Sequence, residues 1–314
     1  LAACVFYYLN ILYGAVLRGV QNTRLPFLIA LGSNVVNFII NYCLILGNFG
    51  FPQLGVQGAA IGTITAYAIG SLAYVILLNR EVLPGVCLKL RPKAFDRDMV
   101  RELLKIGFPA ALDMLILNAA FLSIVGMLGR LDQVAVAAHG IGVRVQALAF
   151  VPGLSVSQAT GAMVGMALGT SDPERARAVT RASVVLCTLI MTSLALAIVI
   201  FSYPIVGIFD VATDSHLEGL TVEWMRLLGY GMPLVGPHIA FVGCLQGSGS
   251  TYSSLSINLV GTIIQIPLSF FLGFTLGMGV TGVWLAFPLS FLLKTSHGWW
   301  LYHRGRWART GIKL

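Results

Sequence analysis

The most informative segment for the fold is VLRGVQNTRLP, residues 16–26, because its skeleton returns near the other end of the chain as CLQGSGSTYSS, residues 244–254. Each segment ends one apolar run, crosses a short polar patch and enters another apolar run. A shift of 228 residues brings identical residues into register. Leu17, Gly19, Thr23, Ile29 and Leu31 then fall on Leu245, Gly247, Thr251, Ile257 and Leu259.

The match continues through a second loop. With a four-residue gap, residues 54–58 (LGVQG) align with residues 278–282 (MGVTG). Chance similarity between apolar helices does not usually preserve two loops. The repeat therefore predicts that the first three helices of the chain and its last three are copies of one unit.

The composition indicates a membrane protein. The chain has 314 residues, of which 57% are hydrophobic and only 10% are charged, against about 25% charged residues in an ordinary soluble domain. A net charge of +8 can indicate nucleic-acid binding, but the basic residues lie between apolar segments instead of on one surface. The five cysteines form no CxxC pair, so neither a disulfide framework nor a metal site is indicated.

Nine apolar stretches are long enough to cross a bilayer, which takes about 20 residues of helix. The fifth is too long for one straight crossing, and Pro152-Gly153 offers a place for a kink. The predicted spans are 1–17, 26–46, 56–78, 107–128, 134–168, 182–208, 224–245, 253–276 and 281–302.

Lys and Arg in short loops are retained on the cytoplasmic face. Alternate loops of this chain hold sixteen such residues, and the opposite set holds only Arg130. We therefore expect the chain to start outside and its C-terminus to lie in the cytoplasm. Residues 80–106, rich in charge, are predicted to link two bundles: three helices in residues 1–79 and six in residues 107–314.

The repeat has a period of six helices, because the first and third helices align with the seventh and ninth. Six is even, so both copies enter the membrane in the same direction. We expect an all-α membrane protein of two pseudo-symmetric lobes, with twelve helices when intact. Leu1 lies inside an apolar run without a preceding Met or signal peptide, so we expect three of the twelve helices to precede it.

Asn34, Asn37 and Asn41 share one face of the second helix, since they are spaced i, i+3, i+7. Under the shift of 228 residues they fall on Thr262, Gln265 and Ser269, so both copies carry a polar stripe. The stripe has two interpretations: hydrogen bonding between helices, or the lining of a cavity.

Asp113 is the one acidic residue well inside an apolar span. It lies eight residues past Lys105, or about 12 Å along a helix. An ionisable group at that depth is a functional candidate, because it is costly to place there. Asp113 either takes up a proton or cation from one side and releases it to the other, or forms a fixed ion pair between helices.

Three basic residues also lie in the spans. Arg226 is expected to snorkel and pair with Glu223, and the stem of Lys294 to reach the cytoplasmic interface. Arg144 should lie near mid-depth, where it needs a partner such as Asp113 or free backbone carbonyls. A structural clamp is its expected role.

The predicted span 224–245 contains GYGMPLVGP, residues 229–237, where Pro and Gly favour bending. This segment is predicted to be a hinge or a cavity wall, with simple packing as the alternative. The residues that we assign to a substrate cavity or its gating are Asn34, Asn37, Asn41, Arg144, Gln146, Tyr230, Met232, Pro233, His238 and Gln265.

In order along the chain, LRGVQNTRLP, GFPQLGVQGAAIGT, GFPAALDM, AVAAHGIGVRVQALAFVPG, ATGAMVGMALG, LQGSGST and LGMGVTGVW resemble the MATE (multidrug and toxic compound extrusion) family. The resemblance implies an inner-membrane antiporter that exports organic, often cationic, amphipathic compounds in exchange for Na⁺ or H⁺. Family members place coupling carboxylates in the first helix of the first lobe, or in the first and fourth helices of the second. Asp113 matches the first helix of the second lobe, whereas the fourth, residues 224–247, has no acidic residue.

The alternatives are a lipid-linked oligosaccharide flippase of similar build, a membrane-embedded enzyme and a passive channel. A flippase needs several cations for a pyrophosphate, and an enzyme needs a cluster such as HExxH, which the sequence lacks. No Walker A pattern is present either. We expect small organic substrates and a lipid bilayer as partners, with no cofactor, nucleic acid or obligate protein partner.

Overall fold

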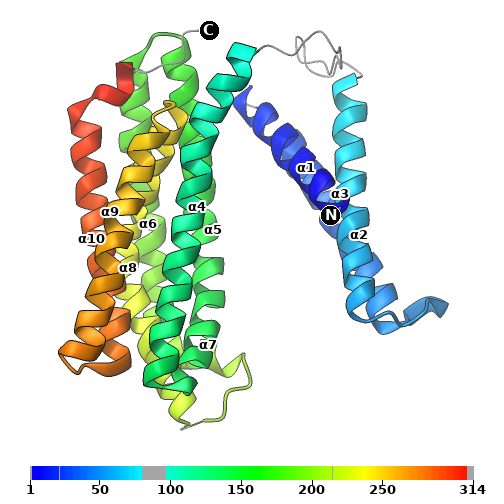
Figure 1. Ribbon diagram of the computed structural model, residues 1–314. Coiled ribbons are helices and arrows are strands. Elements are labelled where there is room, and N and C mark those ends of the chain that lie inside the picture. Colours follow the sequence, from blue (N-terminus) through cyan, green and yellow to red (C-terminus); the bar gives the residue numbers. More distant parts are fainter. Residues whose placement is uncertain (1, 21, 80–96, 214, 310–314) are drawn as a thin grey trace. The chain divides into compact units, whose positions relative to one another are not determined.

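The computed structural model describes residues 2–20, 22–79, 97–213 and 215–309. These residues contain helices and no strand, and a helix lies at each of the nine predicted spans. They fall into two compact units, Leu1–Asp96 and Arg97–Leu314. In the second unit the long helices lie side by side (Figure 1).

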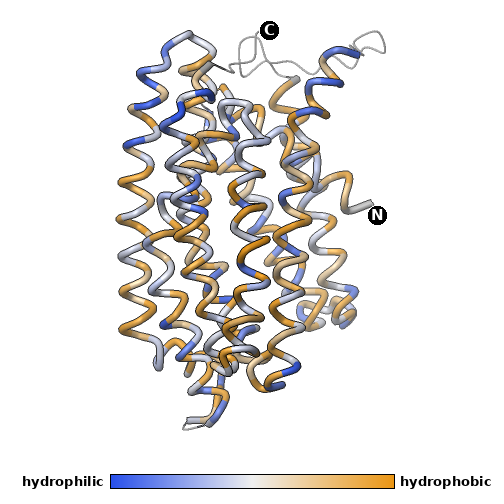
Figure 2. The backbone as a smooth tube through the Cα atoms, turned by 60° about the vertical axis from the view of Figure 1, so that its left-hand side comes forward, coloured by the Kyte–Doolittle hydropathy of each residue, from blue (hydrophilic) through white to orange (hydrophobic). Residues whose placement is uncertain are grey.

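Seven of the described helices are long and apolar enough to cross a membrane. The predicted nine include two more, α1 and α10. Hydrophobic residues dominate the middle of the helices in Figure 2. The chain is therefore a multi-pass membrane protein of the all-α class.

The first unit consists of α1 (Ala2–Gly19), α2 (Arg24–Leu46), the short η1 (Asn48–Gly50) and α3 (Val56–Asn79). Helix α3 packs against both α1 and α2. Leu17, Tyr74 and Leu78 form a buried cluster between them.

The second unit starts with α4, whose first residue, Arg97, lies inside the predicted linker 80–106. Residues 97–106 are thus helical, and residues 80–96 lie outside the described ranges. The helices are α4 (Arg97–Leu131), α5 (Gln133–Gly169), α6 (Pro173–Ile200), α7 (Ser202–Gly207), α8 (His216–Gly247), α9 (Thr251–Phe270), the π-helical η3 (Phe271–Thr275), α10 (Gly279–Arg304) and η4 (Arg306–Arg309).

Helix α8 is the packing centre of this unit, since α5, α6 and α10 all pack on it. Its glycines permit close approach: a Cβ at Gly236 would collide with the backbone of Cys187 on α6, and one at Gly247 with the backbone of Gly161 on α5. Small residues at such crossings let membrane helices pack tightly. Packing thus accounts for these glycines without a hinge.

The predicted repeat is confirmed at its first turn. In the first unit, the Val20 and Asn22 amides donate to the Val16 and Leu17 carbonyls at 3.2 and 2.9 Å. At positions 228 residues later, the Ser248 and Ser250 amides donate to the Cys244 and Leu245 carbonyls at 3.0 and 2.9 Å. The two polar patches therefore form the same turn.

The second loop repeats as well. The Leu54 amide donates to the Leu44 carbonyl at 2.8 Å, and the Met278 amide donates to the Leu272 carbonyl at 3.2 Å. The next residues, Gly55 and Gly279, both have left-handed backbones, with φ of 52° and 62°. Glycine adopts that conformation without steric cost.

A contact between helices is also repeated. Ser71 Oγ on α3 donates to the Phe6 carbonyl on α1 at 3.0 Å, and Thr295 Oγ1 on α10 donates to the Leu234 carbonyl on α8 at 2.7 Å. The three helices of each copy thus share both turns and one polar crossing. Duplication explains all of these matches together.

Candidate functional site

The site is built around Asp113, which lies on α4 and is 3% exposed. Asn258 Nδ2 on α9 donates to Asp113 Oδ2 at 2.8 Å. Asp113 Oδ1 is buried and has no hydrogen-bond partner among the described residues. A buried oxygen without a partner is costly, so this atom marks a place where a proton or another positive group would be favourable.

Lys294 on α10 lies beside this carboxylate. It is 3% exposed, and its Nζ lies 4.7 Å from the centroid of the Phe291 ring. Lys294 interacts electrostatically with Asp113, although the two form no ion pair within 4.0 Å among the described contacts. The expectation that its stem reaches the cytoplasmic interface is wrong, because the stem packs over Gly261 of α9, where a Cβ would collide with it.

His238 on α8 completes the group. Its ring lies edge-on to Phe291, with centroids 5.3 Å apart, and it also interacts electrostatically with Lys294. Its Nδ1 is buried without a partner in the described structure. We call Asp113, His238, Asn258 and Lys294 the buried polar cluster; it joins α4, α8, α9 and α10.

The predicted polar stripe on α9 leads into this cluster. Thr262, Gln265 and Ser269 are all buried, and Ser269 Oγ donates to the Val283 carbonyl on α10 at 3.2 Å. That contact is hydrogen bonding between helices, the first interpretation of the stripe. Thr262 Oγ1 is buried and has no partner among the described residues.

The equivalent stripe on α2 is less buried. Asn34 is exposed, and Asn41 Nδ2 donates to Asn37 Oδ1 at 3.1 Å within the same helix. Asn41 also packs over Gly62 of α3, where a Cβ would collide with Asn41 Oδ1.

The other predicted cavity residues do not converge on Asp113. Arg144 is exposed and Gln146 is half-buried, both on α5. Asp113 is thus not the partner of Arg144; it is bonded to Asn258 instead.

On α8, Tyr230 is exposed, Pro233 is half-buried, and Met232 is fully buried in the main hydrophobic core. Met232 and Tyr230 therefore face different surroundings. Of the predicted residues on this helix, His238 is the one that reaches the cluster.

The predicted pair between Arg226 and Glu223 is wrong. Arg226 instead lies over the Tyr203 ring at 5.6 Å, and Glu223 Oε1 accepts from Thr281 Oγ1 at 2.6 Å. Residues 223 and 226 are one helical turn apart, but each finds a partner on another helix.

Sequence reasoning missed Asn258, although a signal was present. Asn258 lies one turn before Thr262 and so extends the polar stripe, with the spacing 258, 262, 265, 269. Its equivalent in the first copy is Ala30, so the comparison of the two copies did not reveal it.

Asp113 does not line either of two grooves that open on the described part of the second unit. One, of about 510 Å³, lies between α4 and α9 and is lined by Ser123, Met127 and Ile266, among others. The second, of about 440 Å³, lies between α5 and α6 and includes Met163.

A polar contact outside the spans joins the turn between α4 and α5 to the start of α8. His216 Nε2 lies 2.7 Å from Asp132 Oδ2, and Asp132 Oδ1 accepts from the Val134 amide at 2.8 Å as the N-cap of α5. The contact with His216, followed by that amide bond, holds the pKa of the Asp132 carboxyl below its usual range.

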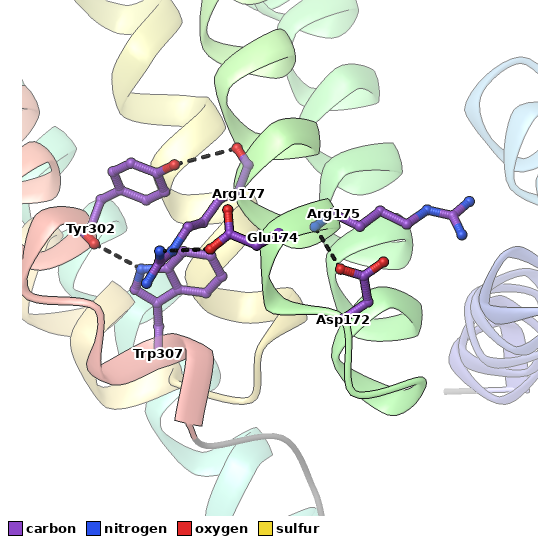
Figure 3. A network of polar contacts seen from close by, with 6 residues as sticks. All are labelled: Asp172, Glu174, Arg175, Arg177, Tyr302 and Trp307. Atoms are coloured by element: carbon purple, nitrogen blue, oxygen red, sulfur yellow. Dashed lines mark hydrogen bonds and ion pairs between the residues drawn. The ribbon is translucent and has the colours of Figure 1, made fainter.

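The opposite end of the bundle is tied by a polar network (Figure 3). Tyr302 Oη on α10 donates to the Arg177 carbonyl on α6 at 3.3 Å, and Trp307 Nε1 donates to the Tyr302 carbonyl at 2.9 Å. Arg177 pairs with Glu174 at 3.0 Å. The network fixes the end of α10 against the start of α6. The described residues contain no group of three or more His, Cys, Asp or Glu side chains suited to a metal ion.

Comparison with known proteins identifies relatives over nearly the whole chain. The family model MatE matches residues 109–271. The chain is 26% identical to the Thermotoga maritima "Probable multidrug resistance protein NorM" over 96% of its own length and 64% of the relative's. It is 30% identical to the Shewanella oneidensis "FAD transporter" over 92% of its own length and 63% of the relative's. The chain thus spans less than two thirds of these relatives.

Solved structures agree on the fold. A "Crystal structure of MATE in the bent conformation" matches 98% of this chain and 67% of that one, with a TM-score of 0.87 and 20% identity. An outward-facing multidrug resistance MATE family transporter matches 96% of this chain and 66% of that one, with a TM-score of 0.86 and 21% identity.

Proposed function

Since the chain belongs to the MatE family, we propose that it forms part of a secondary active antiporter that exports organic, often cationic, amphipathic compounds in exchange for Na⁺ or H⁺. The observation that carries the proposal is the buried carboxylate of Asp113, whose Oδ1 has no hydrogen-bond partner among the described residues. An intramembrane carboxylate of this kind is typical of residues that carry a coupling ion.

In this mechanism Asp113 is the coupling residue. Its carboxylate takes up the ion from the side of higher concentration, which removes a negative charge from the middle of the bundle. Asn258 holds Oδ2 in place by its 2.8 Å hydrogen bond and leaves Oδ1 for the ion. Binding of a cationic substrate and binding of the ion then compete for the same negative charge.

The duplicated three-helix copies support alternating access as the transport mode. Repeats that insert in the same direction are found in transporters whose two halves rock around a central site. We propose twelve helices in the intact protein, a location in the inner membrane, and a cytoplasmic C-terminus, because the Lys and Arg residues gather in the loops on that side.

A flippase for lipid-linked oligosaccharides is the second candidate within the same class. A pyrophosphate in its cavity needs several cations, and among the described residues Lys294 is the buried one. The cluster therefore favours the antiporter. Small organic compounds and the lipid bilayer are the proposed partners.

The test uses the full-length protein in proteoliposomes. A cationic dye is loaded, and its efflux is followed under an imposed proton gradient, an imposed sodium gradient, or neither; FAD forms a second arm because one relative is named a FAD transporter. The proposal predicts that a gradient of one of the two ions accelerates dye efflux. Equal efflux with and without gradients would indicate a passive channel and contradict it.

A further inference from the structure

The carboxylate of Asp113 shares its surroundings with a cation that belongs to the protein. The Lys294 Nζ lies 4.7 Å from the Phe291 ring, in cation–π contact, and Lys294 interacts electrostatically with both Asp113 and His238. Two like charges that lie a few ångströms apart repel each other strongly where water is scarce. A metal cation entering this cluster would meet that repulsion.

The two copies of the repeat show that the place for Lys294 is built into the second unit. The residue equivalent to Lys294 in the first unit is Gly70, and the residue equivalent to Gly261 is Ser33. In the first unit, Ser33 Oγ lies close to Gly70; in the second, Lys294 lies over Gly261. In the first unit the larger residue of the pair is thus Ser33 on α2 and the glycine is on α3. In the second unit the larger residue is Lys294 on α10, and Gly261 on α9 leaves space for its stem.

A third position changes with these two. His238 is equivalent to Asn10, whose Nδ2 donates to the Phe6 and Tyr67 carbonyls, both at 2.8 Å, and to Ser71 Oγ at 2.7 Å. The first unit therefore fills this crossing with neutral hydrogen bonds. The second unit places a histidine and a lysine there, and the lysine interacts with Asp113.

Two groups of the described residues act on Asp113, a hydrogen-bond donor and a cation, and neither is a second carboxylate. Helix α9 contributes the Asn258 amide N–H and α10 contributes the Lys294 ammonium, which in turn interacts with His238 on α8. Helix α5 packs on α4 too, but its Arg144 is exposed and does not act on Asp113. The Lys294 ammonium and an entering metal cation would therefore compete for the single negative charge of Asp113.

We propose that Lys294 is a resident counter-ion of Asp113 and that it makes this site accept a proton in preference to Na⁺. The inference rests on the proposed antiport function and names its coupling ion. When Asp113 releases its proton to water, the carboxylate and the Lys294 ammonium neutralise each other. When Asp113 takes up a proton from water, the carboxylic acid is neutral and the cluster keeps the single positive charge of Lys294.

The test measures ion binding without transport. Purified full-length protein is titrated with radioactive sodium in choline chloride of constant ionic strength, and its thermal unfolding midpoint is followed in parallel. The wild-type protein is expected to show no saturable sodium binding that depends on Asp113. Lys294→Met keeps most of the apolar stem and removes the charge, so it is expected to gain stoichiometric sodium binding and sodium-dependent stabilisation, both absent from the Asp113→Asn/Lys294→Met double variant.

Saturable sodium binding by the wild-type protein that Asp113→Asn abolishes would overturn the inference, and this measurement needs no altered lysine. A folded Lys294→Met variant that binds no sodium would overturn it as well. These results are distinct from a failure of the proposed function, which would show as an absence of gradient-driven efflux for every substrate in proteoliposomes. Sodium binding decides the inference in either case.

Discussion

The side-chain amide of Asn258 donates a 2.8 Å hydrogen bond to Asp113 Oδ2 and so joins α9 to α4 across the interior of the second unit. Asn258 is itself buried. This bond satisfies one carboxylate oxygen and leaves the other, Oδ1, without a partner among the described residues. Asn258 is therefore a positioning residue for the proposed coupling carboxylate.

Replacing Asn258 by Ala should destabilise the protein and slow transport. A hydrogen bond to a charged group contributes about 1.5–3 kcal/mol, and its removal leaves a buried carboxylate without a donor. The thermal unfolding midpoint and the gradient-driven efflux of the full-length variant measure the two effects. Asn118→Ala is the matched control, because exposed Asn118 bonds, among the described residues, to the Met114 carbonyl of its own helix; equal losses in both variants would contradict the assignment.

Replacing Gly247 by Ala should weaken the crossing of α8 and α5. A Cβ there would collide with the backbone of Gly161, and overpacking of this kind costs about 1–3 kcal/mol. Gly140→Ala is the control, since nothing lies within 4 Å of its added Cβ, and Ala stabilises a helix relative to Gly by about 0.5–1 kcal/mol. The unfolding midpoints should move in opposite directions, and a shared direction would show that α8 and α5 do not approach closely.

The repeated crossing offers a paired test of the duplication. Thr295→Val removes one hydrogen bond between helices, whereas Ser71→Ala removes the equivalent bond and also the one that Ser71 Oγ accepts from Asn10 Nδ2. Such bonds contribute about 0.6 kcal/mol on average in membrane proteins, so both variants should lose a small amount of stability, and Ser71→Ala should lose more. Ser296→Ala, which removes only a bond to Leu292 of the same helix, should lose less than either.

Much of this fold was predictable from the sequence because the repeat and the nine apolar spans are patterns along the chain. Asp113 was predictable for the same reason, since a charge inside an apolar run needs an explanation. The surroundings of Asp113 were not. The stem of Lys294 is long enough to reach either the membrane interface or the interior of the bundle. Its direction depends on the space that Gly261 leaves on another helix. Asn258 was hidden because its equivalent in the first copy is Ala30.

The ion pair of Asp132 and His216 predicts a dependence of stability on pH. The pKa of Asp132 is lowered in the folded protein by His216 and by the Val134 amide. Its contribution to stability is therefore present above the ordinary carboxyl pKa and is lost as the pH falls through the lowered value. The unfolding midpoints of the wild-type protein and Asp132→Ala, compared from neutral pH to about pH 3, should differ most at neutral pH and less in acid, where the neutral carboxyl group keeps only its role as an N-cap.

Asp132→Asn separates the two roles of this residue. The Asn side chain still accepts a hydrogen bond as an N-cap but does not titrate as a carboxyl group does. The difference between this variant and Asp132→Ala should then stay constant over the same pH range. A difference that disappears in acid would mean that the cap, and not the charge, responds to pH.

The decisive measurement is gradient-driven efflux of a cationic dye from proteoliposomes that contain full-length Asp113→Asn protein. The amide has nearly the shape of the carboxylate but cannot hold a coupling ion, so the folded variant should lose the gradient-driven component by about a hundredfold or more, as when a positioned proton carrier is removed. An unfolding midpoint close to that of the wild-type protein serves as the folding control. Unchanged gradient-driven efflux in this variant would remove Asp113 from the mechanism and contradict the proposed coupling.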